Sequence, residues 1–261
     1  MGEQSIEQAG GVRDRFARVA RNYASSHFHA DPTRLDEVVV LAEPSLEDLT
    51  LDVATGTGNT ALALAPLVAR VAGLDLTPQM LAEATRLADE RGVTNAAWVL
   101  GDAAALPFAD ASFDLYTARA APHHFPDLER ALREAARVLR PGGRACFIDC
   151  SPPPEVRDFL HRVEKGRDPS HLLSRTMGEW VGLLEDAGLE VEVARRRELE
   201  WDFHGWMANM AVPADREEEL ARIIERAPGE LLELLKPRRR GGRLWHAYWH
   251  ALIRARRPGR P

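Results

Sequence analysis

The sequence predicts an α/β fold: a doubly wound, mostly parallel sheet of seven strands with an antiparallel last strand, plus helical cover segments. Two observations lead to this prediction. Short apolar runs alternate with amphipathic helical segments from about residue 49 to residue 150, which is typical of parallel strands joined by crossover helices. The first run leads into a turn of the spacing G-x-G-x-x-A, formed by Gly56, Gly58 and Ala61.

The chain begins with two helical pieces over residues 5–43, which are separated where Asp31 and Pro32 interrupt the helical pattern,. The alternation of strands and helices starts after them. Its first members are a strand over about 49–54, a helix over about 59–67, and a strand "RVAGLDL" that ends near Asp75.

The segment "TPQMLAEATRLADERG" is the next predicted helix. Thr77 is a suitable N-cap, Pro78 suits the first helical position, and Gly92 closes the helix,. Two strands follow, "AAWVL", which ends at Gly101-Asp102, and "SFDLYTA", which ends near Arg119.

A further helix and strand complete the alternating part. The segment "PDLERALREAARVLRPGG" carries its apolar residues on one helical face, and Pro141-Gly142-Gly143 ends it,. The segment "RACFIDC" then reads as the fifth strand. In such sheets a ligand binds outside the carboxyl ends of the strands, where the strand order reverses. The polar motifs therefore predict a binding site at that edge.

The last third has a different texture. "SPPPE" breaks the chain, helices follow from about residue 155, "EVEVARRRELEW" alternates like a strand, and residues 204–235 look helical. We expect "RLWHAYWHALIRAR" to be a strand that completes the sheet. Five of the six tryptophans lie in this third, so we expect a helical cover with some aromatic side chains facing a substrate, although core packing explains each single tryptophan at least as well. The organisation predicted is an N-terminal helical cover (1–44), a cofactor-binding core (45–150) and the rest of the sheet with a substrate cover (151–261), all in one integrated domain.

Composition limits the possible partners. With 34 Lys and Arg against 40 Asp and Glu, the net charge of −6 gives no reason to expect nucleic-acid binding,. The one basic run, "KPRRRGGR", is expected to be a solvated loop,. No signal peptide and no membrane span is recognised, so a cytoplasmic location is expected. Cys146 and Cys150 are then reduced, buried thiols,.

The glycine turn is compatible with two adenosine-bearing ligands, a nicotinamide dinucleotide and S-adenosylmethionine. Asp75, at the end of the second strand, suits either of them. However, no tyrosine is followed by a lysine four residues on, as a short-chain oxidoreductase would need, and the phosphate-binding sequence G-x-x-x-x-G-K-[ST] is absent. These absences favour S-adenosylmethionine.

Four ordered motifs carry a family resemblance: "LDVATGTG", "GLDLTPQML", "LGDAAALPFADASFDLYTARAAPHHF" and "REAARVLRPGG". Together they resemble class I S-adenosylmethionine-dependent methyltransferases, in the group related to the ubiquinone/menaquinone biosynthesis methyltransferases. The resemblance covers about residues 49–150 and implies a Rossmann-like methyltransferase fold. One departure is Ala54, where the family often has a glycine, and alanine is small enough to keep the turn.

The resemblance also implies roles for particular residues. Asp52 would orient the ammonium group of the ligand, Asp75 would accept from the ribose hydroxyls, and Asp102 would accept from the adenine amino group. Glycines at 56 and 58 would let the backbone pass close to the ligand. The other implied cofactor contacts are Ala54, Leu76, Met80, Ala103, Arg119, Ala120 and Tyr23. Tyr23, His27 and His29 lie on the N-terminal segment, which in such enzymes often folds over the cofactor.

His123 and His124 follow the fourth strand and are the candidate catalytic residues, because an imidazole can act as a general base near neutral pH. A structural role for this pair is an equal alternative. No metal is expected, since the pairs His27/His29 and His246/His250 lack a third ligand,. A small, partly apolar or aromatic methyl acceptor is expected, and the oligomeric state is not readable. Two alternatives stay open: an NAD(P)-dependent oxidoreductase and a non-catalytic S-adenosylmethionine-binding protein.

Overall fold

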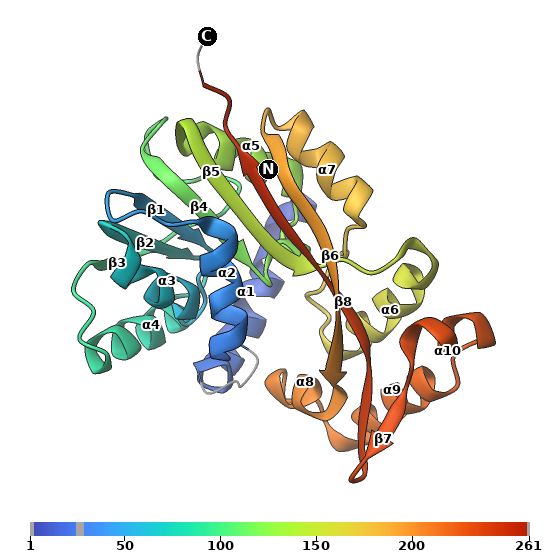
Figure 1. Cartoon of the computed structure of the whole chain (residues 1–261). Helices are drawn as coiled ribbons and strands as arrows, with labels where there is room; N and C mark the ends of the chain where they lie inside the picture. Colours follow the sequence, from blue (N-terminus) through green and yellow to red (C-terminus); the bar gives the residue numbers. More distant parts are fainter. Residues whose placement is uncertain (1–2, 25–28, 260–261) are drawn as a thin grey trace.

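One continuous sheet runs through the molecule, with helices on both of its faces (Figure 1). The structure is a computed structural model that describes residues 3–24 and 29–259. The strands are β1 (Leu49–Val53), β2 (Arg70–Asp75), β3 (Ala96–Leu100), β4 (Phe113–Arg119), β5 (Leu139–Cys150), β6 (Glu190–Asp202), β7 (Arg238–Arg240) and β8 (Arg243–Arg256).

The strand order is β3-β2-β1-β4-β5-β8-β6. Strands β1 to β5 pair in parallel, and β8 is antiparallel to both of its neighbours, β5 and β6. This is the predicted doubly wound sheet with an antiparallel last strand, and the prediction is confirmed. The order reverses between β1 and β4, which therefore form the edge where a ligand crevice is expected.

One face of the sheet is covered by α5 (Leu128–Val138) and α7 (Met177–Asp186). The helix α5 has buried apolar residues at the spacing that puts them on one side, which is why it can lie against β4 and β5,. Trp180 of α7 packs on Phe147 of β5 with ring centroids 5.6 Å apart. Burial of these large apolar side chains is the main contribution to the stability of this layer.

The opposite face carries α2 (Pro32–Ala42), α3 (Asn59–Leu64) and α4 (Pro78–Glu90). Val38 and Leu41 of α2 are buried against Leu115 of β4 and Ile148 of β5. A short 3-10 turn (Ala65–Leu67) extends α3. The helix α2 thus belongs to the layer of helices on this face of the sheet.

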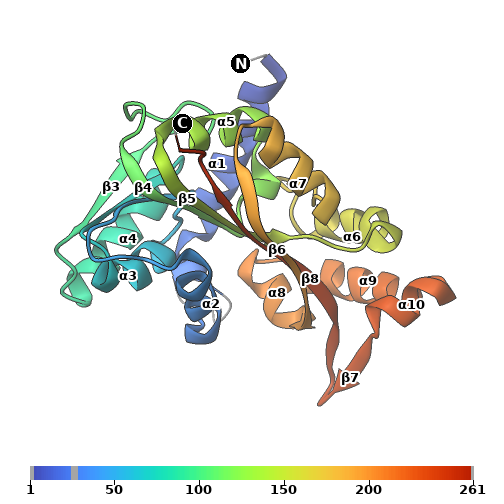
Figure 2. The ribbon, with the colours of Figure 1, turned by 45° about the horizontal axis from the view of Figure 1, so that its top comes forward.

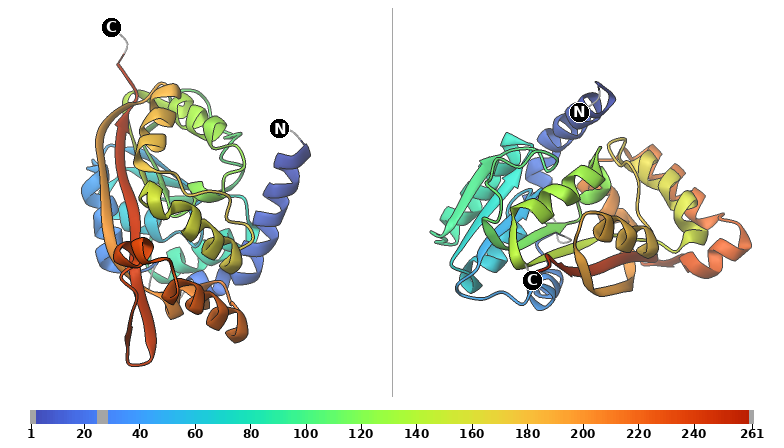
Figure 3. Two further views of the ribbon diagram at one scale, coloured as in Figure 1. Left: turned by 90° about the vertical axis from the view of Figure 1, so that its right-hand side faces the viewer. Right: turned by 90° about the horizontal axis from the view of Figure 1, so that it is seen from above.

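The helix α1 (Glu3–Ala24) takes no part in either layer. It packs beside α4 and α8 (Phe203–Asn209) and crosses the carboxyl ends of the strands. The two views of Figure 3 show it standing apart from the helices that cover the sheet. The two predicted N-terminal pieces therefore do different things: α1 covers the strand ends and α2 supports the sheet.

The last third forms a second apolar cluster. Figure 2 shows α8, α9 (Ala214–Glu225) and α10 (Gly229–Leu235) grouped around the far ends of β6 and β8. With α6 (Pro154–Arg167) they bury a set of side chains that includes Phe159, Trp206 and Ile224. Because β8 lies between β5 and β6, this cluster is attached to the rest of the molecule through the sheet itself.

The structure corrects two predicted elements. The fifth strand begins at Leu139, directly after α5, so that "RPGG" belongs to the strand. The basic run is part of a hairpin in which β7 pairs with β8 across Gly241-Gly242, which both have positive φ. Its side chains are exposed and face carboxylates, as between Arg239 and Glu225 at 2.6 Å. Only the short strand β7 was not predicted, because its three arginines show no alternation of apolar and polar residues.

Candidate functional site

A cavity opens at the carboxyl ends of β1, β2, β3 and β4, where the strand order predicts it. It holds about 1060 Å³ of free space, counting the part open to solvent. The glycine turn, the ends of the strands and the segment after β4 form most of the wall, and α1 closes it from outside. All predicted cofactor residues line this cavity except Gly58.

Gly58 is needed for packing. Its φ of +79° lies in the left-handed region, and a Cβ at this position would lie 2.6 Å from the Trp98 ring and 3.0 Å from Ala84,. Gly56 also has a positive φ, +55°, but a Cβ there would meet no heavy atom within 4 Å. Gly56 therefore leaves open space on the cavity side, whereas Gly58 allows α3 to approach β3. Ala54 adopts a φ of +53° without glycine.

Asp52 ends its strand as a buried carboxylate. It accepts hydrogen bonds from the hydroxyls of Thr55 and Thr117, each at 2.6 Å. Burial raises the pKa of Asp52 to about 6, and the two hydroxyls and the Arg119 charge only partly oppose this. A carboxylate whose ionisation is disfavoured in the empty protein would be stabilised by a cation placed in the cavity.

Asp75 connects the second strand to the glycine turn. Its carboxylate accepts from the amide of Gly56 at 2.8 Å and from the amide of Thr77 at 2.9 Å. Burial raises the pKa of Asp75 although these amides favour the charged form. Each oxygen keeps a further lone pair, so the carboxylate can also accept from two hydroxyls of a ligand.

Asp102 follows β3 and accepts from the amide of Ala104 at 2.8 Å, which holds the carboxylate beside Ala103. Met80 is buried and, with Leu76, adds apolar surface between Asp75 and Asp102. The three acids thus end three neighbouring strands and surround one apolar slot. These carboxylates fit an adenosine with a charged tail, because they offer acceptors for its hydroxyl and amino groups and a negative charge for its ammonium group.

Arg119 and Ala120 follow β4. The Arg119 guanidinium is held by Thr60 Oγ1 at 2.9 Å and by the carbonyl of His29 at 2.7 Å. Burial lowers the pKa of Arg119 to about 10, so the side chain is still a cation at neutral pH. Ala120 adopts a φ of +53°, which turns the chain away from the sheet toward the 3-10 turn that carries the histidines (Pro122–His124).

The helix α1 contributes an aromatic wall. Phe16 lies edge-on to His124 at 5.0 Å and to Tyr23 at 5.5 Å, and Tyr23 stacks on His29 at 4.4 Å. Tyr23 donates to the Met210 sulfur at 3.2 Å, and burial raises the pKa of Tyr23 to about 12. His27, which the sequence analysis associated with this segment, lies outside the described residues.

The structure places the two candidate catalytic histidines differently relative to the cavity. His124 lines the cavity and is 6% exposed. His123 lies behind it, where its ring and its amide contact the two oxygens of Asp149 at 2.6 and 2.8 Å. Although burial disfavours the charged ring, Asp149 raises the pKa of His123 well above its usual value. His123 is therefore built as a clamp between β4 and β5, and His124 is the imidazole that a substrate can reach.

Cys150 lies beside this clamp. A ligand-type atom of each of His123, Asp149 and Cys150 lies within 4.8 Å of the others, and Cys150 also contacts Ser174 Oγ at 3.0 Å. Hydrogen bonds join these groups, and the absence of a metal stays a prediction. Both cysteines of the chain are free and buried, as expected.

Phe16 lines the cavity and was not predicted to do so, because the pattern of its helix shows only amphipathicity. Arg15 and Asp168, for which no role was predicted, are not part of the cavity wall, but Asp168 lies 3.7 Å from His124 and 4.0 Å from Arg15.

Of the two interpretations of the tryptophans, the structure supports core packing. All six tryptophans are described, and the cavity wall contains none of them. Four of the five in the last third are buried in apolar clusters, namely Trp180, Trp201, Trp206 and Trp249,, while Trp245 is half-buried.

Fold and cavity together define a Rossmann-like α/β enzyme that binds its ligand across the carboxyl edge of a parallel sheet. Residues 51–147 match the family model described as a methyltransferase domain. The uncharacterized methyltransferase YcgJ of Bacillus subtilis is 34% identical over 82% of this chain and 86% of its own length. A crystal structure of YcgJ superposes with a TM-score of 0.82 at 31% identity, covering 87% of this chain and 99% of that one.

A second relative is the demethylmenaquinone methyltransferase of Thermus thermophilus, 42% identical over 49% of this chain and 59% of its own length. The chain belongs to the S-adenosylmethionine-dependent methyltransferases, in the group related to the ubiquinone/menaquinone biosynthesis enzymes. It is an enzyme of this class, and S-adenosylmethionine is its methyl donor. No helix of the described ranges has the length and apolar character needed to cross a bilayer.

Proposed function

We propose that the protein transfers the methyl group of S-adenosylmethionine to a small-molecule acceptor bound in the same cavity. The observation that carries the proposal is the wall of this cavity. Asp52, Asp75 and Asp102 line it together with Phe16 and His124, whose rings lie against each other at 5.0 Å. The three carboxylates suit the polar adenosine and its charged tail, and the two rings suit a partly apolar or aromatic acceptor.

In this assignment the cofactor residues are those that line the cavity: Asp52, Ala54, Gly56, Asp75, Leu76, Met80, Asp102, Ala103, Arg119, Ala120 and Tyr23. Gly58 serves the same turn through packing. When bound, S-adenosylmethionine supplies a methyl group already activated by its sulfonium. The protein then has to align the acceptor, exclude water with α1, and accept a proton where the acceptor has one to lose.

The match to relatives of the quinone-biosynthesis group varies in extent, from 40% to 77% of this chain. The part of the wall that α1 contributes and the loop after α6 lie outside the 51–147 match. A quinone acceptor is therefore one candidate among small aromatic molecules, and it enters the acceptor screen on equal terms with the others.

Thermal unfolding with S-adenosylmethionine, S-adenosylhomocysteine or NAD(P)H tests the proposal. A ligand at 100 times its dissociation constant adds about 2.7 kcal/mol of stability, which raises the Tm by roughly 5–10 °C at this size. We expect this shift with the two sulfur ligands and none with NAD(P)H. A shift with NAD(P)H alone would support the oxidoreductase alternative. Binding of both sulfur ligands without transfer to any acceptor would support the non-catalytic alternative.

A further inference from the structure

The loop after α6 contacts His124, which lines the cavity. This contact determines which ring nitrogen of His124 carries the proton. His124 Nδ1 lies 3.0 Å from the carbonyl oxygen of Ser170. A carbonyl has no proton to give, so Nδ1 must be the donor. In the neutral ring Nε2 is then an acceptor with a free lone pair.

Nε2 faces a second acceptor. It lies 3.7 Å from Oδ2 of Asp168, whose side chain is fully buried. This oxygen has no hydrogen-bond partner among the described residues. The other oxygen, Oδ1, accepts from the amide and the hydroxyl of Ser170 at 2.9 and 2.6 Å, which fixes the carboxylate plane. Two buried acceptors therefore face each other without a proton between them, an arrangement that a proton or a donor group completes.

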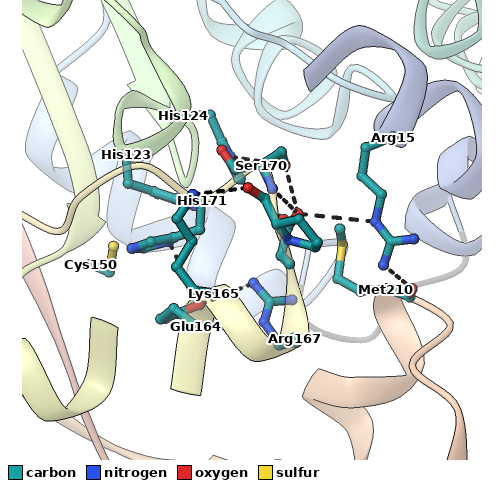
Figure 4. A network of polar contacts seen from close by, with 12 residues as sticks. Arg15, His123, His124, Cys150, Glu164, Lys165, Arg167, Ser170, His171 and Met210 are labelled. Atoms are coloured by element: carbon teal, nitrogen blue, oxygen red, sulfur yellow. Dashed lines mark hydrogen bonds and ion pairs between the residues drawn. The ribbon is translucent and has the colours of Figure 1, made fainter. Parts of the chain in front are cut away.

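The surroundings of this pair connect it to the helix α1. Arg15 Nε lies 4.0 Å from Asp168 Oδ1, and the guanidinium of Arg15 donates to the Met210 carbonyl at 2.6 Å. Figure 4 shows the histidines and Cys150 on one side of this network and Arg15 with Met210 on the other. The helix that closes the cavity is thus in electrostatic contact with Asp168.

We propose that His124 is the general base of the methyl transfer and Asp168 its positioning residue, so that the acceptor is a molecule with an O–H or N–H proton to lose. This inference rests on the proposed function. During transfer the acceptor proton moves to Nε2. The electron pair of the acceptor heteroatom forms the bond to the methyl carbon, and the pair of the methyl–sulfur bond stays on sulfur. The imidazolium formed lies beside the Asp168 carboxylate, which stabilises it.

The protonation states agree with these roles. Burial and the nearby His123 charge lower the pKa of His124, so the ring is neutral and able to accept. Although burial opposes ionisation of Asp168, the Arg167 charge lowers the pKa of this carboxyl. A weak base of this kind suits an acidic proton, such as that of a phenol, better than that of an aliphatic alcohol. The charged and titratable groups around His124 are His123, Arg15, Arg167, Asp168 and His171.

The first test reads the hydrogen bond of a bound probe. 4-Nitrophenol is titrated in the presence of S-adenosylhomocysteine at a pH where the free probe is mostly protonated, with 4-nitroanisole as the probe without a proton. We expect the wild type to shift the absorption of the bound phenol to longer wavelength, because its hydroxyl donates to Nε2 of His124, and His124→Asn to abolish the shift. An unshifted spectrum with the wild type, or an equal shift with His124→Asn or with 4-nitroanisole, overturns the inference.

The second test measures methyl transfer to 4-nitrophenol over pH. His124→Asn should lower kcat by about 10²-fold or more, with KM changed far less. Asp168→Asn should lower kcat and move the acidic limb of the profile to lower pH, because a facing negative charge that raises the pKa of His124 is lost. Asp168→Glu should restore part of the rate. A merely structural role of Asp168 would lower the amount of folded enzyme without moving the limb.

Two matched variants control these measurements. His204→Asn and Asp158→Asn change an exposed histidine and an exposed aspartate outside the cavity, and both should behave like the wild type. Binding of S-adenosylhomocysteine by calorimetry shows that each variant is folded. A wild type that fails to bind it refutes the proposed function. A wild type that binds it but transfers no methyl group to 4-nitrophenol, or does so independently of His124, refutes this inference alone.

Discussion

At the scale of single residues, Asp52 shows how the fold prepares a charge for its ligand. Its carboxylate is buried at the end of β1, and two threonine hydroxyls supply its hydrogen bonds. The pKa of about 6 means that ionisation costs stability in the empty protein. A pKa raised by about 2 units corresponds to roughly 3 kcal/mol.

The sign of the pH dependence follows from this shift. The folded state holds a proton on Asp52 up to about pH 6, whereas the ordinary pKa of an aspartate side chain is 3.8. Stability contributed by this group therefore increases as the pH falls from 6 to 4. We expect Asp52→Asn to lack this component, so the difference in unfolding free energy between the two proteins should change across that window. Urea unfolding at pH 7 and pH 5 measures the unfolding free energy of each protein. An equal change in this free energy between the two pH values for both proteins would contradict the prediction.

The same substitution should separate stability from binding. At pH 7 Asp52→Asn removes a buried charge and should leave the protein at least as stable as the wild type. It should nevertheless weaken S-adenosylmethionine binding, because an amide cannot neutralise the ammonium group of the ligand. Calorimetric titration of both proteins at pH 7 provides the measurement. Undiminished affinity would mean that Asp52 only caps the turn.

At the scale of elements, α1 is the helix that closes the cavity. It belongs to neither layer of the sheet, and its described polar contacts include Arg15 to the Met210 carbonyl and Tyr23 to the Met210 sulfur. Both reach across 187 residues or more of sequence. Elements that cover a ligand site are often ones that open locally. The cavity lies beneath α1, so ligand exchange should depend on these contacts.

We expect Arg15→Ala to accelerate dissociation of S-adenosylhomocysteine while the Tm of the ligand-free protein changes little. Arg15 is partly exposed and contributes no core packing, so its removal should change the stability of the fold little. Stopped-flow displacement gives the dissociation rate. Arg18→Ala, an exposed arginine on the same helix, is the matched control and should dissociate at the wild-type rate. A large loss of Tm for Arg15→Ala would show instead that α1 stabilises the whole fold.

At the scale of the whole molecule, the sheet joins both apolar clusters. β8 pairs with β5 over Arg144–Cys150 and with β6 over nearly its full length. The last third therefore shares its backbone hydrogen bonds with the cofactor half, and the division at residue 150 has no structural boundary in the sheet. We propose that the chain folds as one integrated domain, as the sequence predicts.

This proposal predicts a single unfolding transition, with a calorimetric enthalpy equal to the van't Hoff enthalpy. Ile224→Ala, in the cluster of the last third, should lower stability by about 2–5 kcal/mol. Because both clusters unfold together, this loss should lower one Tm and leave the transition unsplit. Differential scanning calorimetry decides between this outcome and two resolved peaks, which would show that residues 151–261 unfold by themselves.

The cofactor side of the cavity could be predicted because its residues sit at strand ends in chain order. Asp52, Asp75 and Asp102 each follow an apolar run, and parallel strands bring such ends to one edge. The hairpin of β7 could not be predicted, because its pairing depends on β8 and on carboxylates from other segments. The sequence could not decide whether the tryptophans face the cavity or pack in the core, because hydrophobicity shows that a residue is buried but not in which cluster.

The sequence by itself determined the class of fold, the family with its methyl donor, and the strand-end residues that line the cavity, since these depend on local motifs and on the fixed geometry of parallel strands. Only the tertiary structure decided which histidine faces the cavity and what surrounds it. His124 meets Ser170 across 46 residues, and Arg15 meets Met210 across 195. Contacts of this kind arise from the packing of loops and helices on the finished sheet, and no periodicity along the chain records them.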